Sequence, residues 1–154
     1  MPAGEVTLTA TTTKEAKNDT TYKVEHYKET LDGTYELAET EELTGTTGEE
    51  VTAVAKTYEG FTEDTEKEER VAEGSIVGDG SLVLKLFYKR NEYNLNLNKD
   101  ENIESVTGAG TYKYGVTVSI NATLKEEAGY EIRWNKWVSS DASLVAENEN
   151  KMQQ

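Results

Sequence analysis

Hydrophobic and polar residues alternate along several short stretches of this chain, as in β-strands that have one buried face. The most apolar stretch is Gly80–Arg90. One face of this predicted strand carries four large apolar side chains: Leu82, Leu84, Leu86 and Tyr88. The opposite face is half apolar, as expected for an inner strand of a sheet. We therefore predict that Gly80–Arg90 is the central strand of one module and leads directly into the next.

The same alternation predicts a β-hairpin in the first half of the chain. Tyr22–Lys28 is the first strand and Tyr35–Thr40 is the second. Between them, Asp32-Gly33 is the dipeptide that tight hairpin turns favour. This hairpin precedes the central strand by some forty residues, so it needs a connection that returns the chain to the sheet.

A helix is predicted in that connection. Thr47–Glu50 has the form of a capping box, and Gly60 is placed to end the helix. The apolar residues between them follow helical spacing: Val51, Val54, Ala55 and Tyr58. Val71, in the charged stretch after the helix, is a further strand or edge position. Residues 21–91 therefore read ββαββ, an α+β module of β-grasp type. Its first and last strands are expected to lie parallel in the centre of the sheet.

Residues 92–154 show alternation and no helical pattern, so we predict a small, mainly β module. Four strands are expected, at Tyr93–Leu97, Ile103–Val106, Val116–Ala122 and Gly129–Trp134, with glycine-rich turns between some of them. The last apolar pair is Leu144-Val145.

The chain opens with one more alternating stretch. In residues 5–13, Val6, Leu8 and Ala10 share one face, and threonines occupy most of the other. This pattern predicts a strand, and residues 14–20 read as a polar linker that separates it from the first module.

Composition narrows the class of protein. The chain has 154 residues, of which 35% are hydrophobic and 30% charged, which suits two small modules better than one globule. The net charge of −14 argues against nucleic acid and anionic membranes as partners. Cysteine is absent, so disulfides, thiolate metal sites and cysteine nucleophiles are excluded. We expect no cofactor and no metal.

Candidate chemistry is sparse, and each candidate has a structural reading that we favour. His26 is the single histidine and lies mid-strand without a nucleophile motif nearby. The alternating oxygen side chains at 98–104 depart from a calcium loop at its glycine and glutamate positions, and Gly108–Gly110 lacks a phosphate-loop lysine. The acidic run at 63–69 reads as a solvated sheet edge. Lys85 is the one lysine placed for an isopeptide cross-link, and no motif names its partner.

Aromatic residues of the second half are the remaining binding candidates. They are Tyr112, Tyr114, Tyr130, Trp134 and Trp137. Such rings can stack on sugars, and small β modules also use them in their cores. We expect those that point away from the apolar face to be the ligand contacts, if there is a ligand.

Several spaced motifs resemble a known family. Tyr22–Tyr27, Leu31–Tyr35, Thr44–Gly48 and Gly80–Arg90 are similar to the mucin-binding-protein (MucBP) and internalin B-repeat group over residues 21–91. The second half resembles a divergent internalin B-repeat, through Gly110–Thr123, Gly129-Tyr130 and Trp134–Trp137. The resemblance implies a β-grasp fold, no enzymatic activity, and a stalk or adhesin attached to the cell wall of Gram-positive bacteria.

The resemblance also implies that the chain is cut out of register with its repeats. Residues 1–13 then form the closing strand of a preceding repeat, and the module at 92–154 lacks its own last strand. Expected partners are neighbouring repeats of the same protein, and a host glycan or extracellular protein is the alternative. We further expect Val6, Leu8 and Ala10 to pair with the open edge near Trp134–Val145 of another copy, head to tail.

Overall fold

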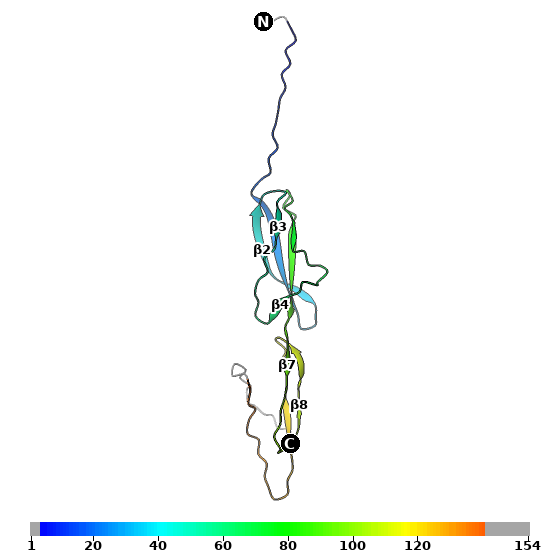
Figure 1. Cartoon of the computed structure of the whole chain (residues 1–154), viewed down its shortest axis with the longest axis vertical. Helices are drawn as coiled ribbons and strands as arrows, with labels where there is room; N and C mark the ends of the chain where they lie inside the picture. Colours follow the sequence, from blue (N-terminus) through cyan, green and yellow to red (C-terminus); the bar gives the residue numbers. More distant parts are fainter. Residues whose placement is uncertain (1–3, 141–154) are drawn as a thin grey trace. The chain divides into compact units, whose positions relative to one another are not determined.

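The computed structural model describes residues 4–140 of the chain (Figure 1). Within this range it contains ten strands and no helix. The chain divides into two compact units. The first comprises the residues up to Thr57 together with Glu63–Lys89, and the second comprises Tyr58–Thr62 together with the residues from Arg90 onward.

A four-stranded sheet with the order β2-β1-β6-β4 organises the first unit, and its outermost residues Phe61-Thr62 of β4 and Arg90 of β6 are assigned to the second unit. Its strands are β1 (Thr20–Glu29), β2 (Tyr35–Gly45), β6 (Val83–Arg90) and β4 (Phe61–Glu63). β1 pairs antiparallel with β2 and parallel with β6, with Lys23 opposite Val83 and Lys28 opposite Tyr88. The predicted hairpin and the predicted parallel central pair are therefore confirmed.

The core lies on one face of this sheet. Tyr22 and Val24 of β1 and Leu84 of β6 are buried together with Ile76 from the connection. A second, two-stranded ladder covers them, formed by β3 (Glu50–Thr52) and β5 (Glu73–Ser75). From Thr20 to His26 every second residue of β1 is buried, so one face of this strand is directed into the core.

The helix predicted at residues 47–60 is wrong, and with it the ββαββ, α+β assignment. Val51 and Ala53 pack on the core while Val54 is 79% exposed. The two core residues are two positions apart, which is the spacing of an extended chain and not of a helix. Thr46–Glu49 forms a tight turn in which Glu49 N–H donates to Thr46 O and Gly48 has a φ of +86°. A helix of about ten residues has little stability of its own, so pairing with β5 decides the conformation.

The second unit consists of two separate ladders in its described part. β7 (Glu92–Leu95) pairs with β9 (Gly110–Lys113), and β8 (Ile103–Thr107) pairs with β10 (Asn121–Leu124). The predicted all-β character holds for these residues. The strand predicted at Val116–Ala122 is largely wrong, because only its last two residues enter β10, and residues 129–138 belong to no strand. Leu144-Val145 lies outside the described residues.

The strand predicted at residues 5–13 is likewise absent from this single chain. These residues are exposed throughout and belong to no ladder, with Val6 71% and Leu8 91% exposed. The chain joins the first unit where Lys17 O accepts a hydrogen bond from Thr47 N–H. β1 then begins at Thr20, so the last residue of the predicted linker 14–20 is already part of the sheet.

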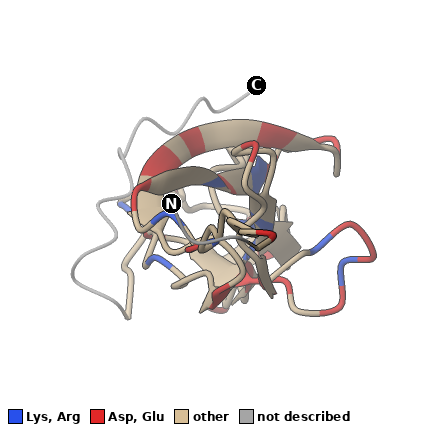
Figure 2. Ribbon diagram, turned by 90° about the horizontal axis from the view of Figure 1, so that it is seen from above, with Lys and Arg blue, Asp and Glu red and all other residues tan. Residues whose placement is uncertain are grey.

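Charge is distributed as the composition suggests. Acidic residues colour much of the ribbon and outnumber the basic ones (Figure 2). The long outer strand β2 carries four glutamates, Glu36, Glu39, Glu41 and Glu42. An edge strand with this many carboxylates repels the strands of like molecules.

Candidate functional site

His26 lies at the centre of a buried hydrogen-bonded network in the first unit. It is fully buried on β1, and Tyr88 of β6 is 1% exposed. His26 Nδ1 lies 2.9 Å from Tyr88 Oη, and His26 Nε2 lies 2.7 Å from Glu41 Oε1 of β2. The backbone N–H of Lys56 donates to Tyr88 Oη over 3.0 Å. The network therefore ties β1, β2, β6 and the segment after β3 together.

The Glu41 carboxylate can only accept, so His26 Nε2–H is the donor of the hydrogen bond between them. Tyr88 Oη accepts the Lys56 N–H and is also hydrogen-bonded to His26 Nδ1. A carboxylate, an imidazole and a hydroxyl thus follow one another as in a catalytic relay. Here the hydroxyl belongs to a buried tyrosine, so the relay ends inside the core.

Glu41 and Lys56 close the network at the surface. The hydrogen bond from His26 and the neighbouring Lys56 ammonium hold the pKa of the Glu41 carboxyl below its usual range. Lys56 Nζ lies 2.6 Å from Glu39 Oε1 and 3.4 Å from Glu41 Oε2. Burial raises the pKa of the Tyr88 phenol, which keeps it protonated and able to donate. The network therefore contributes to the packing of the first unit.

The acidic run at 63–69 does not form a paired-carboxylate site. Glu63 Oε1 accepts from Arg70 at 2.6 Å, and Asp64 accepts the Tyr35 hydroxyl proton at 2.7 Å. Both contacts tie the loop after β4 back to the first unit. Lys85 Nζ lies 5.9 Å from the ring centre of Tyr27, an aromatic contact that gives no support to a cross-link.

The second unit holds an open groove with a volume of about 360 Å³. Ile103 of β8 and Leu124 of β10 contribute apolar side chains on one side. Residues 130–136, which belong to no strand, contribute Tyr130, Ile132 and Trp134. Charged and amide side chains complete the lining, among them Asp100, Asn102, Glu127 and Lys136. Aromatic and polar groups therefore converge at this groove.

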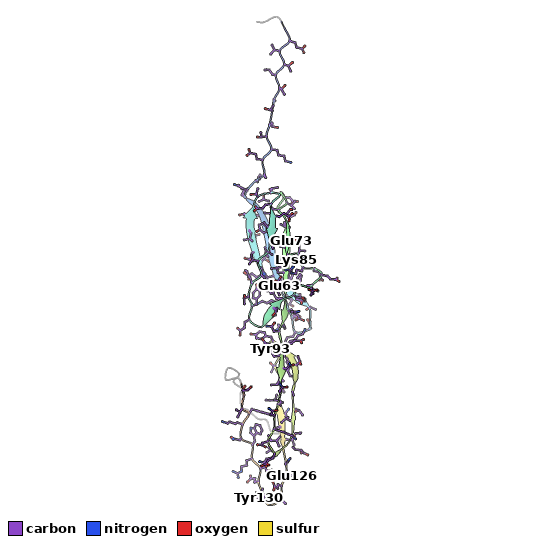
Figure 3. All side chains as sticks on the ribbon, in the orientation of Figure 1. Glu63, Glu73, Lys85, Tyr93, Glu126 and Tyr130 are labelled. Carbon is purple, nitrogen blue, oxygen red and sulfur yellow. The ribbon has the colours of Figure 1, made fainter. Side chains whose placement is uncertain are left out.

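The five candidate aromatics separate into two groups. Tyr130 and Trp134 line the groove, and Trp137 packs edge-on against Trp134 with ring centres 5.3 Å apart. Tyr130 is 74% exposed and lies at the far end of the unit from Tyr93 (Figure 3). These three remain the candidates for ligand contact.

Tyr112 and Tyr114 are engaged elsewhere in the second unit. The Tyr112 hydroxyl donates to Gly108 O over 2.8 Å, so this ring braces the glycine turn. The Tyr114 ring packs edge-on against Phe61 at 6.0 Å between ring centres. Arg90 Nη1 donates to Tyr114 O over 2.7 Å and lies over the Phe61 ring. Both tyrosines thus have packing roles rather than a place in the groove.

The loop at 98–104 contributes to the groove without the geometry of a calcium loop. Asp100 Oδ1 accepts the backbone N–H of Asn102 at 2.9 Å, which is an Asx turn. Within residues 4–140 no group of three or more histidine or acidic side chains is arranged to hold a metal ion. Gly108 has a φ of +104° and forms a turn, as its sequence context predicted.

Sequence reasoning missed the partners of His26 and half of the groove. Glu41 and Lys56 are distant from His26 in sequence, and both look like ordinary surface charges. Ile132 and Lys136 line the groove from a segment whose alternation had been read as a strand. No family model, curated protein or solved structure matches the chain. No helix among residues 4–140 has the length and apolar character needed to cross a bilayer.

Proposed function

We propose that this chain is a non-catalytic structural spacer, a segment of the stalk of a bacterial surface protein. The observation that carries the proposal is the parallel pairing of β1 and β6 in the centre of the first unit. The chain enters this unit through β1 and leaves it through β6, so a load along the chain acts on these two strands.

The parallel arrangement means that a load along the chain acts parallel to the two central strands. Tension pulls β1 from its N-terminal end at Thr20 and β6 from its C-terminal end at Arg90, which lie at opposite ends of the pair. Hydrogen bonds between parallel strands then share the load in shear, and separation requires that they break together. The buried contacts of Leu84 and Leu86 add to this resistance. Such a unit holds its length under tension.

The buried relay supports a non-catalytic role as well. His26, the only histidine, is fully buried with both ring nitrogens engaged, and the tyrosine hydroxyl it contacts is also buried. A general base needs access to the proton it removes. Placement on the Gram-positive cell wall, among neighbouring repeats of the same protein, rests on the resemblance of the motifs at 21–91 and 110–137. The acidic surface keeps neighbouring stalks apart.

Single-molecule force spectroscopy tests the spacer function. The chain has no cysteine, so introduced cysteines define the two attachment points. Attachment at Asp19→Cys and Lys89→Cys, both exposed positions, shears β1 against β6. Attachment at Leu31→Cys and Lys89→Cys instead pulls both strands from the same end and unzips them. We expect the shear geometry to unfold the first unit at a several-fold higher force. Equal forces in the two geometries contradict the proposal.

Ligand binding by the second unit is the alternative function, and the groove is the observation that favours it. Tyr130 and Trp134 offer aromatic faces beside amide and carboxylate side chains, a combination that suits the apolar face and hydroxyl groups of a sugar. A glycan array with the intact chain tests this reading. Binding that is lost in Tyr130→Ala and Trp134→Ala, and kept in the control Tyr93→Ala, supports a glycan ligand. Tyr93 is a suitable control because it is 54% exposed and lies outside the groove.

A further inference from the structure

The second unit lacks a completed core in its described part. No described residue of this unit is buried, whereas ten residues of the first unit are. Ile103, Leu124, Ile132 and Trp134 are half-buried and face the same groove. Residues 131–136 belong to no strand, and their side chains alternate between exposed and half-buried up to Asn135. Half-buried apolar side chains beside an alternating segment outside any ladder are what a sheet leaves when one strand is missing.

Residues 6–13 have the complementary properties. Val6 and Leu8 alternate on one face and are 71% and 91% exposed, and Ala10 continues that face. The backbone of this segment belongs to no ladder in the described chain. Exposed backbone groups of an extended, β-branched segment favour pairing with a strand edge. The donor strand, defined here as residues 6–13, is therefore a strand in sequence that has no sheet.

We propose that the donor strand of one copy inserts into the groove of the second unit of another copy, head to tail. Its apolar face covers the half-buried side chains, and its backbone pairs with the edge at 131–136. This contact is heterologous, since the donor and the groove are different surfaces of the molecule. It therefore adds copies in an open chain rather than closing a symmetric dimer.

Charge favours this occupant. Each molecule carries a net charge of −14, so copies repel one another except where an uncharged segment makes the contact. The donor strand has no charged residue, and it is bounded by Glu5 and Lys14. The groove is lined by charges of both signs: Asp100, Glu127, Glu131, Arg133 and Lys136. Lys14 and Glu5 at the ends of the donor strand can each pair with a lining residue of opposite charge.

The edge of the four-stranded sheet at β2 is a poorer acceptor. The outer strand β2 of the first unit presents Glu36, Glu39, Glu41 and Glu42, and its neighbouring core is already closed by the second ladder. A sugar in the groove satisfies the polar lining but leaves the backbone at 131–136 and the apolar side chains of β8 and β10 uncovered. A strand satisfies all three.

The test compares substitutions on the two faces of the donor strand in the full chain. Val6→Asp with Leu8→Asp places charge on the apolar face, and Thr7→Asp with Thr9→Asp places the same charge on the opposite face as a matched control. Sedimentation velocity over a concentration series is expected to show wild-type growth beyond a dimer. The first pair should weaken association by tenfold or more relative to the control. Monomeric wild type at all concentrations, or equal weakening by both pairs, overturns the proposal.

A mixing experiment then establishes the head-to-tail arrangement. The Val6→Asp, Leu8→Asp chain keeps its groove, and an Ile132→Asp chain keeps its donor strand. Neither should associate alone, and a mixture should form a one-to-one pair. Continued self-association of the Ile132→Asp chain means that donor strands pair with each other, which overturns the groove assignment.

A peptide of residues 4–13 keeps the proposal testable if Ile132→Asp unfolds the second unit. The peptide is titrated into the Val6→Asp, Leu8→Asp chain while tryptophan fluorescence is recorded, because both tryptophans lie at or beside the groove. A saturable change that a peptide with the same two aspartates fails to produce supports the donor-strand site. No change with the native sequence overturns it, and displacement of a bound glycan by the peptide would place both ligands in the same groove.

Discussion

Replacing Tyr88 by phenylalanine removes one oxygen atom from the core of the first unit and leaves its ring in place. Two groups lose their partner: the Lys56 backbone N–H, at 3.0 Å, and His26 Nδ1, at 2.9 Å on a fully buried side chain. Each buried polar group left unsatisfied costs about 1–3 kcal/mol. We expect the unfolding free energy of the first unit to fall by roughly 2–4 kcal/mol, since the Lys56 N–H is only partly buried.

The assay separates the two units by their spectroscopic probes. Both tryptophans belong to the second unit, so tryptophan fluorescence follows that unit, while far-UV circular dichroism follows the strands of both. In a urea titration of Tyr88→Phe, the transition of the first unit should move to lower urea and the fluorescence transition should stay in place. Tyr22→Phe is the matched control. Tyr22 is also buried on the core face, and no hydrogen bond of its hydroxyl is found in the described chain.

The comparison of these two variants decides the argument. If Tyr88→Phe costs no more than Tyr22→Phe, the buried network contributes nothing beyond ring packing and our reading of it is wrong. A double substitution with His26→Leu provides a second check. It should cost less than the sum of its parts, because the hydroxyl has no Nδ1 to satisfy once the imidazole is gone.

Three further predictions test other parts of the first unit. In urea titrations, Val54→Asp should change the unfolding free energy by less than about 0.5 kcal/mol, as exposed substitutions do, whereas Val51→Asp should be clearly destabilising. Equal destabilisation by the two substitutions would mean that both residues lie on the buried face of a helix, contrary to the structure. Leu84→Ala should cost about 2–5 kcal/mol in the same assay because Leu84 is fully buried, and a cost below about 1 kcal/mol would mean that the core is not packed as described. Because His26 lowers the pKa of Glu41, the stabilisation from this carboxylate is present above its ordinary pKa of 4.5 and is lost as pH falls through the lowered value. The Glu41→Gln chain should therefore have a lower unfolding free energy than the wild type at neutral pH, and its unfolding free energy should fall less on acidification. If the unfolding free energies of the two chains change with pH in parallel, this prediction is wrong.

The sequence alone determined the strands of the central sheet. Tyr22–Lys28 and Tyr35–Thr40 fall inside β1 and β2, and Gly80–Arg90 contains β6. Strand alternation is a local signal, because neighbouring side chains point to opposite faces whatever the strand pairs with. The Asp-Gly turn at 32–33 is equally local. The parallel pairing of β1 with β6 followed from the order of the elements, and the structure bears it out even though the element between them is not a helix.

The sequence also limited the candidate site without resolving it. Tyr130, Trp134 and Trp137 were recognised as possible ligand contacts, and they do gather at one groove. Tyr112 and Tyr114 were grouped with them because all five are aromatic. Their separation depends on Gly108 and Phe61, with which they make contact across turns that no local pattern describes.

The tertiary structure decided the conformation of residues 47–60 and the role of His26. Two subsets of the apolar residues in that segment suggest different conformations. Residues 51, 54, 55 and 58 have the spacing of one helix face, whereas residues 51 and 53 have the spacing of one strand face. Pairing with β5 and packing against the core cluster that contains Ile76 favour the extended conformation. So short a helix gains too little from its own hydrogen bonds to compete. His26 acquires its partners only when β2, β6 and Lys56 converge on it, since a side chain's chemistry in a folded protein is set by neighbours that can be distant in sequence.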